Sequence, residues 1–110
     1  MSQTSALQVT DANFTTEIEE SKGLAMVDFW AAWCGPCRMV GPVVEQLAAE
    51  YADQGVKVAK LDVDSNPRTT ARFGIRSIPA ILFFKDGKQV DTVVGAVPKA
   101  HLEQKIQHHL

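Results

Sequence analysis

The sequence predicts an α/β fold, a sandwich in which roughly five strands alternate with about four helices that cover both faces of one sheet. Short apolar, strand-like segments alternate along the chain with segments whose apolar residues recur at helical spacing. One segment, 24–30, is almost continuously apolar, as expected for a central strand buried on both faces. With 110 residues, 45% of them hydrophobic, we expect residues 1–110 to form a single domain with one core.

The chain begins with a short strand and a short helix. Residues 6–9 (ALQV) are the strand candidate. The side chain of Thr10 or Asp11 can then cap a helix that carries Phe14 and Ile18 on one face.

The central strand leads into the longest predicted helix. Asp28 is the one charged residue in the strand 24–30 (LAMVDFW). After the two cysteines, apolar side chains recur at helical spacing from Met39 to Tyr51. Pro42 lies inside this helix, where its missing N–H should bend the axis without ending the element.

The second half of the chain continues the alternation. Residues 56–63 (VKVAKLDV) form the next strand and residues 65–74 (SNPRTTARFG) a short helix. Residues 80–94 contain two strand-like runs around Asp86 and Gly87, which is a strong hairpin signal. The last two strands should therefore be antiparallel neighbours.

A closing helix follows Pro98, with Leu102, Ile106 and Leu110 on one apolar face. It lacks the usual Ser, Thr or Asp cap, so its start should fray. We expect the three histidines to lie on the exposed end of this helix and assign them no role. They are His101, His108 and His109.

Composition narrows the function classes. Charged residues make up 22% of the chain and the net charge is -2, so the basic surface that nucleic acid or an anionic membrane would require is missing. The N-terminus has no basic flank leading into an apolar signal core, and the longest apolar runs, such as 80–84 (AILFF), are too short to span a bilayer. We expect a cytoplasmic monomer that binds neither nucleic acid nor membrane.

Both cysteines of the chain lie in the motif WCGPC. In a reducing compartment a permanent structural disulfide is not expected, so the pair needs a chemical reason. Cys34 lies where a strand ends and a helix begins, a position that stabilises the thiolate, and we expect it to be the nucleophile. Cys37 is one helical turn further on and should resolve the mixed disulfide. Gly35 gives a client room to approach, and Pro36 pre-sets the first helical turn.

The cysteine pair has two other interpretations, a zinc site and a purely structural pair. A zinc site would need two further ligands, and the three histidines miss the usual spacing between histidine ligands. A purely structural pair conflicts with the expected compartment.

Asp28 and Lys60 are candidates for proton transfer. Strand alternation places Asp28 among bulky apolar neighbours just before the cysteines, where burial should raise its pKa. It could take the proton of Cys37 as that thiol attacks; the alternative is a structural Asp paired across the sheet. Lys60 could tune this carboxyl if the two strands are neighbours, or it could extend to solvent.

An apolar ledge beside Cys34 could accept a client. Pro79 stands at the first position of a strand, where a cis bond is possible, and the turn 94–97 (VGAV) could lie next to it. Trp33 flanks the nucleophile, so we assign it to the client surface, whereas Trp30 is assigned to core packing.

The chain resembles the thioredoxin family from Leu7 to Leu110. Besides WCGPC, the segments that carry the resemblance occur in the same order as in the family. They are VDFWAAWCGPCRM, KLDVDSNPRTTARFGIRSIP, FKDGK and VGAVPK.

The resemblance implies a mixed five-stranded sheet between four helices, and a protein disulfide reductase. It implies that Cys34 is the nucleophile, that Cys37 is the resolving thiol, and that Asp28 and Lys60 are the buried proton-handling pair. It also implies a cis peptide at Ile78-Pro79 and a groove that accepts clients. The residues implied for that groove are Trp33, Gly35, Pro36, Val63, Ile78, Pro79, Gly95 and Ala96.

The same resemblance implies that thioredoxin reductase, a flavin enzyme using NADPH, supplies the electrons, and that this chain binds no cofactor itself. Two positions depart from the family pattern. Ala80 stands where Thr is common, so a hydroxyl near the site is missing, and Pro98 stands at the closing helix without the frequent Ser cap. The competing function is a binding module that presents the same ledge to a partner without turnover.

Overall fold

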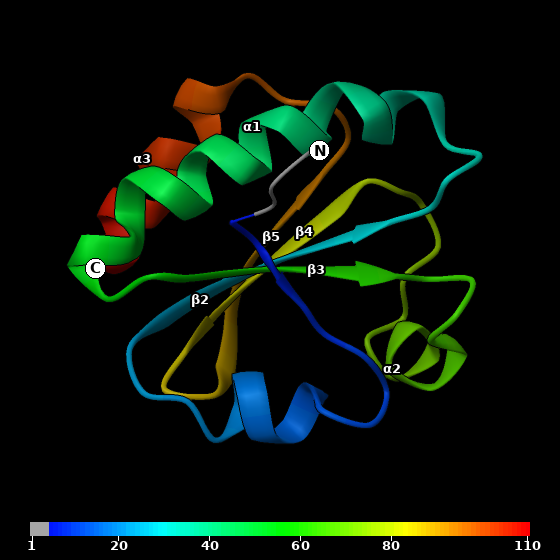
Figure 1. Ribbon diagram of the computed structural model, residues 1–110, viewed down its shortest axis with the longest axis horizontal. Coiled ribbons are helices and arrows are strands. Elements are labelled where there is room, and N and C mark those ends of the chain that lie inside the picture. Colours follow the sequence, from blue (N-terminus) through cyan, green and yellow to red (C-terminus); the bar gives the residue numbers. More distant parts are fainter. Residues whose placement is uncertain (1–4) are drawn as a thin grey trace.

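The structure, a computed structural model, describes residues 5–110, and within them five segments pair into one mixed sheet (Figure 1). The strands are β1 (Leu7–Gln8), β2 (Leu24–Trp30), β3 (Lys57–Asp62), β4 (Ala80–Lys85) and β5 (Lys88–Val94). Across the sheet their order is β1-β3-β2-β4-β5, with β3 parallel to both β1 and β2, and β4 antiparallel to both β2 and β5. The predicted α/β class and mixed sheet are confirmed.

Helices cover both faces of the sheet, as predicted (Figure 1). The helices of residues 5–110 are η1 (Thr15–Glu19, a π-helical turn), α1 (Gly35–Tyr51, continued by the 3-10 turn η2, Ala52–Gln54), α2 (Pro67–Arg72) and α3 (Lys99–His109). α1 and α3 pack on one face and η1 and α2 on the other. α1 continues through Pro42.

β2 is the central strand, which explains its apolar sequence. Its side chains alternate between the two faces, so Met26 packs beneath α1 and α3 whereas Phe29 packs with η1 and the α2 region. β2 pairs with β3 on one side and β4 on the other, and the register places Asp28 opposite Lys60 and opposite Ile81. The single charge of the strand therefore lies in the middle of the sheet, on the α1 side.

The β4–β5 hairpin confirms the prediction made from Asp86 and Gly87. Both residues adopt left-handed backbone conformations, with φ of +51° and +85°. Two consecutive positive φ angles are what the tightest hairpin turns require, and Asp-Gly adopts them readily.

The expected side-chain cap of the first helix is not found, because Phe14 is the N-cap residue of η1 and makes no capping hydrogen bond. The hydroxyl of Thr10 accepts the N–H groups of Ala12 and Asn13 at 3.2 Å, in the turn before the helix. Asp11 instead accepts the backbone N–H of Thr69 at 2.8 Å, and so caps α2, which is far away in sequence. The reason is topological, because the β1–η1 connection passes beside the first turn of α2.

The end of the closing helix also differs from expectation. His101 and His108 are exposed, but His109 is half-buried and its Nε2 lies 2.9 Å from Oδ2 of Asp91 on β5. Leu110 was expected on the apolar face, yet it follows the last helical residue and is 50% exposed. The packing of α3 on the sheet turns the His109 side chain toward β5, and the helix ends before Leu110 can reach the core.

Candidate active site

Cys34 and Cys37 form a disulfide at the junction between β2 and α1. Cys34 is the N-cap of α1, with extended backbone angles, and Cys37 is in the first turn, so the Cα atoms are 5.3 Å apart. The backbone N–H of Cys37 donates a hydrogen bond to Sγ of Cys34 at 3.2 Å. This hydrogen bond and the positive end of the helix dipole both favour negative charge on that sulfur.

Cys34 and Cys37 are equally buried, although the sequence predicted that only Cys37 would face away from water. Cys37 was expected to face away from water, and it does, but both cysteines are 4% exposed as whole residues. The difference between them is electrostatic, because Cys34 occupies the cap position and receives the N–H of Cys37.

Several of the predicted client-groove residues do gather around the disulfide. Val63 and Ile78, together with Trp30, pack on the cluster formed by Ala31 and the two cysteines. The carbonyl oxygen of Ile78 lies 3.8 Å from Sγ of Cys34. The Ile78-Pro79 peptide is cis, as the resemblance implied.

The turn that contains Gly95 lies against Pro79. The N–H of Gly95 donates to the carbonyl of Pro79 at 2.8 Å, and Gly95 has a positive φ of +102°. Ala96 is exposed and lines a different cavity, between α1 and the start of α3, together with Met39 and Val43. The structure therefore brings Gly95 to the ledge and directs Ala96 toward a neighbouring hollow.

Three residues beside Cys34 are exposed to solvent. Trp33 is 67% exposed, and its indole N–H donates to Oδ2 of Asp64 at 3.0 Å. Gly35 and Pro36 are exposed, and a Cβ placed at Gly35 would meet no atom within 4 Å. This surface has room for an incoming chain, with a tethered indole at its border.

Asp28 is buried without a partner. The residue is 1% exposed, and neither carboxyl oxygen has a hydrogen-bond partner among residues 5–110. Burial raises the pKa of Asp28 to about 7, with Lys60 lowering it and Glu45 raising it. The missing hydrogen bonds argue against the structural alternative of a satisfied Asp paired across the sheet.

Lys60 lies near Asp28 in register, but its ammonium pairs elsewhere. Its Nζ is 3.5 Å from Oε2 of Glu45, a residue of α1, and 5.1 Å from the centre of a Trp30 ring. Lys60 is thus half-buried beside Glu45 and does not extend freely to solvent.

A cavity of about 250 Å³ lies between Cys37 and Lys60. Cys37 lines it from α1 and Lys60 lines it from β3, and Trp30 and Arg38 also contribute to its wall. The guanidinium of Arg38 donates to the carbonyl of Ala32 at 3.0 Å. Asp28 lies behind this cavity, because its register partner Lys60 and its same-face neighbour Trp30 both line it.

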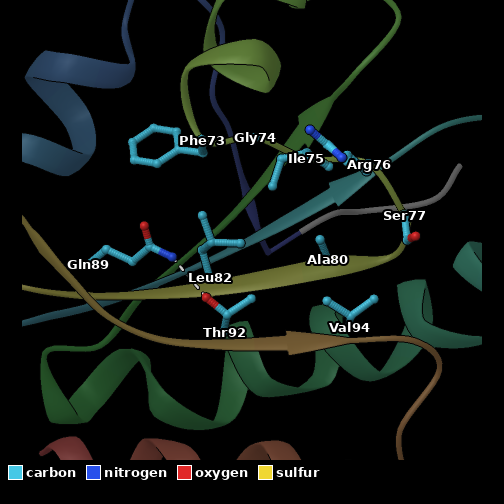
Figure 2. Close-up of a pocket in the computed structure, with 10 residues that line it drawn as sticks. All are labelled: Phe73, Gly74, Ile75, Arg76, Ser77, Ala80, Leu82, Gln89, Thr92 and Val94. Atoms are coloured by element: carbon cyan, nitrogen blue, oxygen red, sulfur yellow. Dashed lines mark hydrogen bonds between the residues drawn. The ribbon is translucent and has the colours of Figure 1, made fainter.

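A second cavity, of about 230 Å³, is lined by Ala80, the residue that stands where Thr is common in the family (Figure 2). Ala80 and Leu82 of β4 face it together with Ile75, and Thr92 and Gln89 of β5 are joined by a hydrogen bond at its edge. Neither cysteine lines this cavity. A threonine hydroxyl at position 80 would therefore face this cavity on the η1 and α2 side of the sheet. It would not contact the disulfide.

Sequence reasoning missed Glu45, Asp64 and Arg38. Glu45 could have been found, because Cys37, Gly41 and Glu45 are four residues apart and so share one side of α1. Asp64 carries no local signal, since its contact with Trp33 depends on how two loops meet.

Two sulfurs that can bond to each other, with one held where a thiolate is stabilised, can accept or deliver a disulfide. The fold and this site therefore define the chain as a thiol–disulfide oxidoreductase. Comparison with known proteins places it more narrowly.

The Thioredoxin family model matches residues 5–108. The chain is 56% identical over 105 residues to Thioredoxin 1 of Synechococcus elongatus, with 96% of this chain and 97% of the relative covered. It is 52% identical over 103 residues to Thioredoxin 2 of Chlorobaculum tepidum, covering 94% of each, and 51% identical over 106 residues to Thioredoxin of Porphyra purpurea, covering 96% and 98%. The chain belongs to the thioredoxin family, and it exchanges disulfides with disulfide-containing substrates.

Residues 5–110 bring no three potential ligands of the His, Cys, Asp or Glu type together for a metal ion. None of the helices in the same range is both long enough and apolar enough to cross a bilayer.

Proposed function

We propose that this protein reduces disulfides in other proteins, with Cys34 as the nucleophile and Cys37 as the resolving thiol. The Cys34 thiolate attacks one sulfur of a client disulfide, forms a mixed disulfide, and releases the other client sulfur as a thiolate. Cys37 then attacks Sγ of Cys34, which forms the intramolecular disulfide and releases the reduced client. The observation that carries this assignment is the hydrogen bond from the Cys37 N–H to Sγ of Cys34 at the helix N-terminus.

Asp28 and Lys60 handle the proton of the resolving step in this proposal. Cys37 must lose its proton before it attacks, and a carboxyl with a pKa of about 7 is well matched to accept one near neutral pH. The cavity shared by Cys37 and Lys60 is wide enough for water to carry the proton toward Asp28.

Clients bind on the ledge around Cys34. The exposed Trp33, Gly35 and Pro36 form one side of it. Val63, Ile78, Pro79 and Gly95 form the other side, with Ala96 at its border. A client chain would lie extended along the Ile78-Pro79 segment.

Thioredoxin reductase, using NADPH, is the proposed electron donor that returns the disulfide to two thiols. The family membership supports this partner. We further propose that residues 1–110 act as one monomeric domain in the cytoplasm, where a reducing environment suits this direction of exchange.

The test is insulin reduction driven by NADPH and thioredoxin reductase. Cys34→Ser should abolish turnover, whereas Cys37→Ser should accumulate a stable mixed disulfide with the client, detectable by mass spectrometry. Trapping of the client through Cys37 in the Cys34→Ser variant, with no adduct in Cys37→Ser, would reverse the assignment.

A further inference from the structure

Glu45 joins three parts of the molecule on the side of α1 that faces β3 and the N-terminal segment. Its Oε1 accepts the backbone N–H groups of Ser5 at 2.6 Å and Ala6 at 2.9 Å. Its Oε2 is buried, makes no hydrogen bond within residues 5–110, and lies 3.5 Å from Nζ of Lys60. The two amides fix the orientation of the carboxylate, so Oε2 is held toward Lys60.

Two carboxylates, those of Asp28 and Glu45, lie near the ammonium of Lys60. The register pairs it with Asp28, but its ammonium lies beside Glu45 and over the Trp30 ring. Both oxygens of Asp28 remain without a hydrogen-bond partner in the described residues. The charge that would most directly neutralise Asp28 is therefore directed at Glu45.

We propose that Glu45 is a positioning residue for proton transfer at Asp28: it holds the Lys60 ammonium against α1 and so keeps the buried Asp28 carboxyl without a direct cationic partner. The inference rests on the proposed role of Asp28 as the proton acceptor for Cys37. In this arrangement Asp28 is a stronger base than it would be with Lys60 in direct contact, which favours uptake of the Cys37 proton.

The charges around Asp28 agree with this role. β3 contributes Lys60, and α1 contributes Glu45 together with Arg38, whose guanidinium is bound to the Ala32 carbonyl. β4 contributes the apolar Ile81 directly opposite. Burial has the largest effect on the pKa of Asp28, Lys60 lowers it, and Glu45 raises it again.

Glu45→Gln is the decisive variant, because the amide keeps an oxygen for the Ser5 and Ala6 N–H groups while the charge is removed. Titration of the Asp28 side-chain carboxyl by carbon-13 NMR in the oxidised protein measures the effect directly. We expect its midpoint to fall by about one pH unit. Glu50→Gln is the matched control, since Glu50 pairs with Lys99 on the exposed side of the same helix and its loss should leave the midpoint in place.

A midpoint that stays within 0.2 or so of a pH unit of the parent protein's value in Glu45→Gln, or that falls equally in Glu50→Gln, overturns the inference. So does a lowered melting temperature with an unmoved midpoint, which is what a merely structural role for Glu45 would give.

Kinetics separate this inference from the proposed function. In the single-turnover resolving step, Glu45→Gln should shift the acid limb of the pH profile to lower pH, and it should have no such effect in an Asp28→Asn background. If Asp28→Asn alone leaves the resolving rate unchanged at every pH, the proposed role of Asp28 fails. The NMR midpoints then still decide whether Glu45 controls the charge of Asp28.

Discussion

Asp28 makes the folding stability of this protein depend on pH. Its pKa is about 7 in the folded state, above the value of about 3.9 expected in the unfolded chain. The contribution of this group to stability is therefore fully present below about pH 4, and it is lost as the pH rises through 7, because the ionised form must then be kept buried.

Asp28→Asn should remove this dependence. We expect the difference in unfolding free energy, variant minus parent protein, to increase by on the order of 4 kcal/mol between pH 4 and pH 9. Urea unfolding at several pH values measures the difference, and Asp53→Asn, at an exposed carboxyl on η2, is the control. A constant difference between the Asp28→Asn and parent curves across that range would contradict the pKa assigned to Asp28.

At the scale of elements, contacts between non-neighbouring segments hold the helices in place. Oδ2 of Asp91 on β5 lies 2.9 Å from Nε2 of His109 and 3.1 Å from Nζ of Lys105, both on α3. The His109 hydrogen bond is the main cause that lowers the pKa of Asp91 to about 2. Because the folded pKa lies below the unfolded value, the stabilisation is present above about pH 4 and is lost as the pH falls toward 2.

Asp91→Asn should lower the unfolding free energy at pH 7 by roughly 1 kcal/mol, since the cluster is partly exposed. The loss should shrink toward pH 3, where the parent protein's own pair weakens. Denaturant unfolding of both proteins at pH 7 and pH 3 provides the measurement. An equal loss at both pH values would mean that the charge of Asp91 contributes nothing.

At the scale of the whole molecule, the fold brings the cysteine pair, the cis-proline loop and the buried acid together at one end of the sheet. β2 delivers Asp28 and leads into α1 with its two cysteines, whereas the Ile78-Pro79 segment arrives immediately before β4. Because β4 lies next to β2, the proline loop must meet the start of α1.

The Cys34→Ser, Cys37→Ser double variant separates catalysis from binding for the whole protein. We expect it to fold normally, because both residues are small, and to lose disulfide reduction and cellular complementation completely. Circular dichroism checks the fold, and growth of a strain that depends on this protein checks function. Full complementation by the double variant would support the competing binding module.

Much of the fold was predictable because the signals are local. The apolar run of β2, the helical period after the cysteines and the Asp-Gly turn each report the structure of the segment that contains them. The roles expected of Cys34 and Cys37 likewise follow from their place at a strand–helix junction. These features depend on the order of residues within a few turns, which is what a sequence displays directly.

The tertiary structure alone decided which distant groups meet. Lys60 pairs with Glu45 and not directly with Asp28, Asp11 caps α2, and His109 turns back to Asp91. Each of these contacts depends on the relative placement of elements that are far apart in the chain. Side-chain charges interact strongly only over a few ångströms, so the local pattern of the sequence could supply the candidates but could not select the partners.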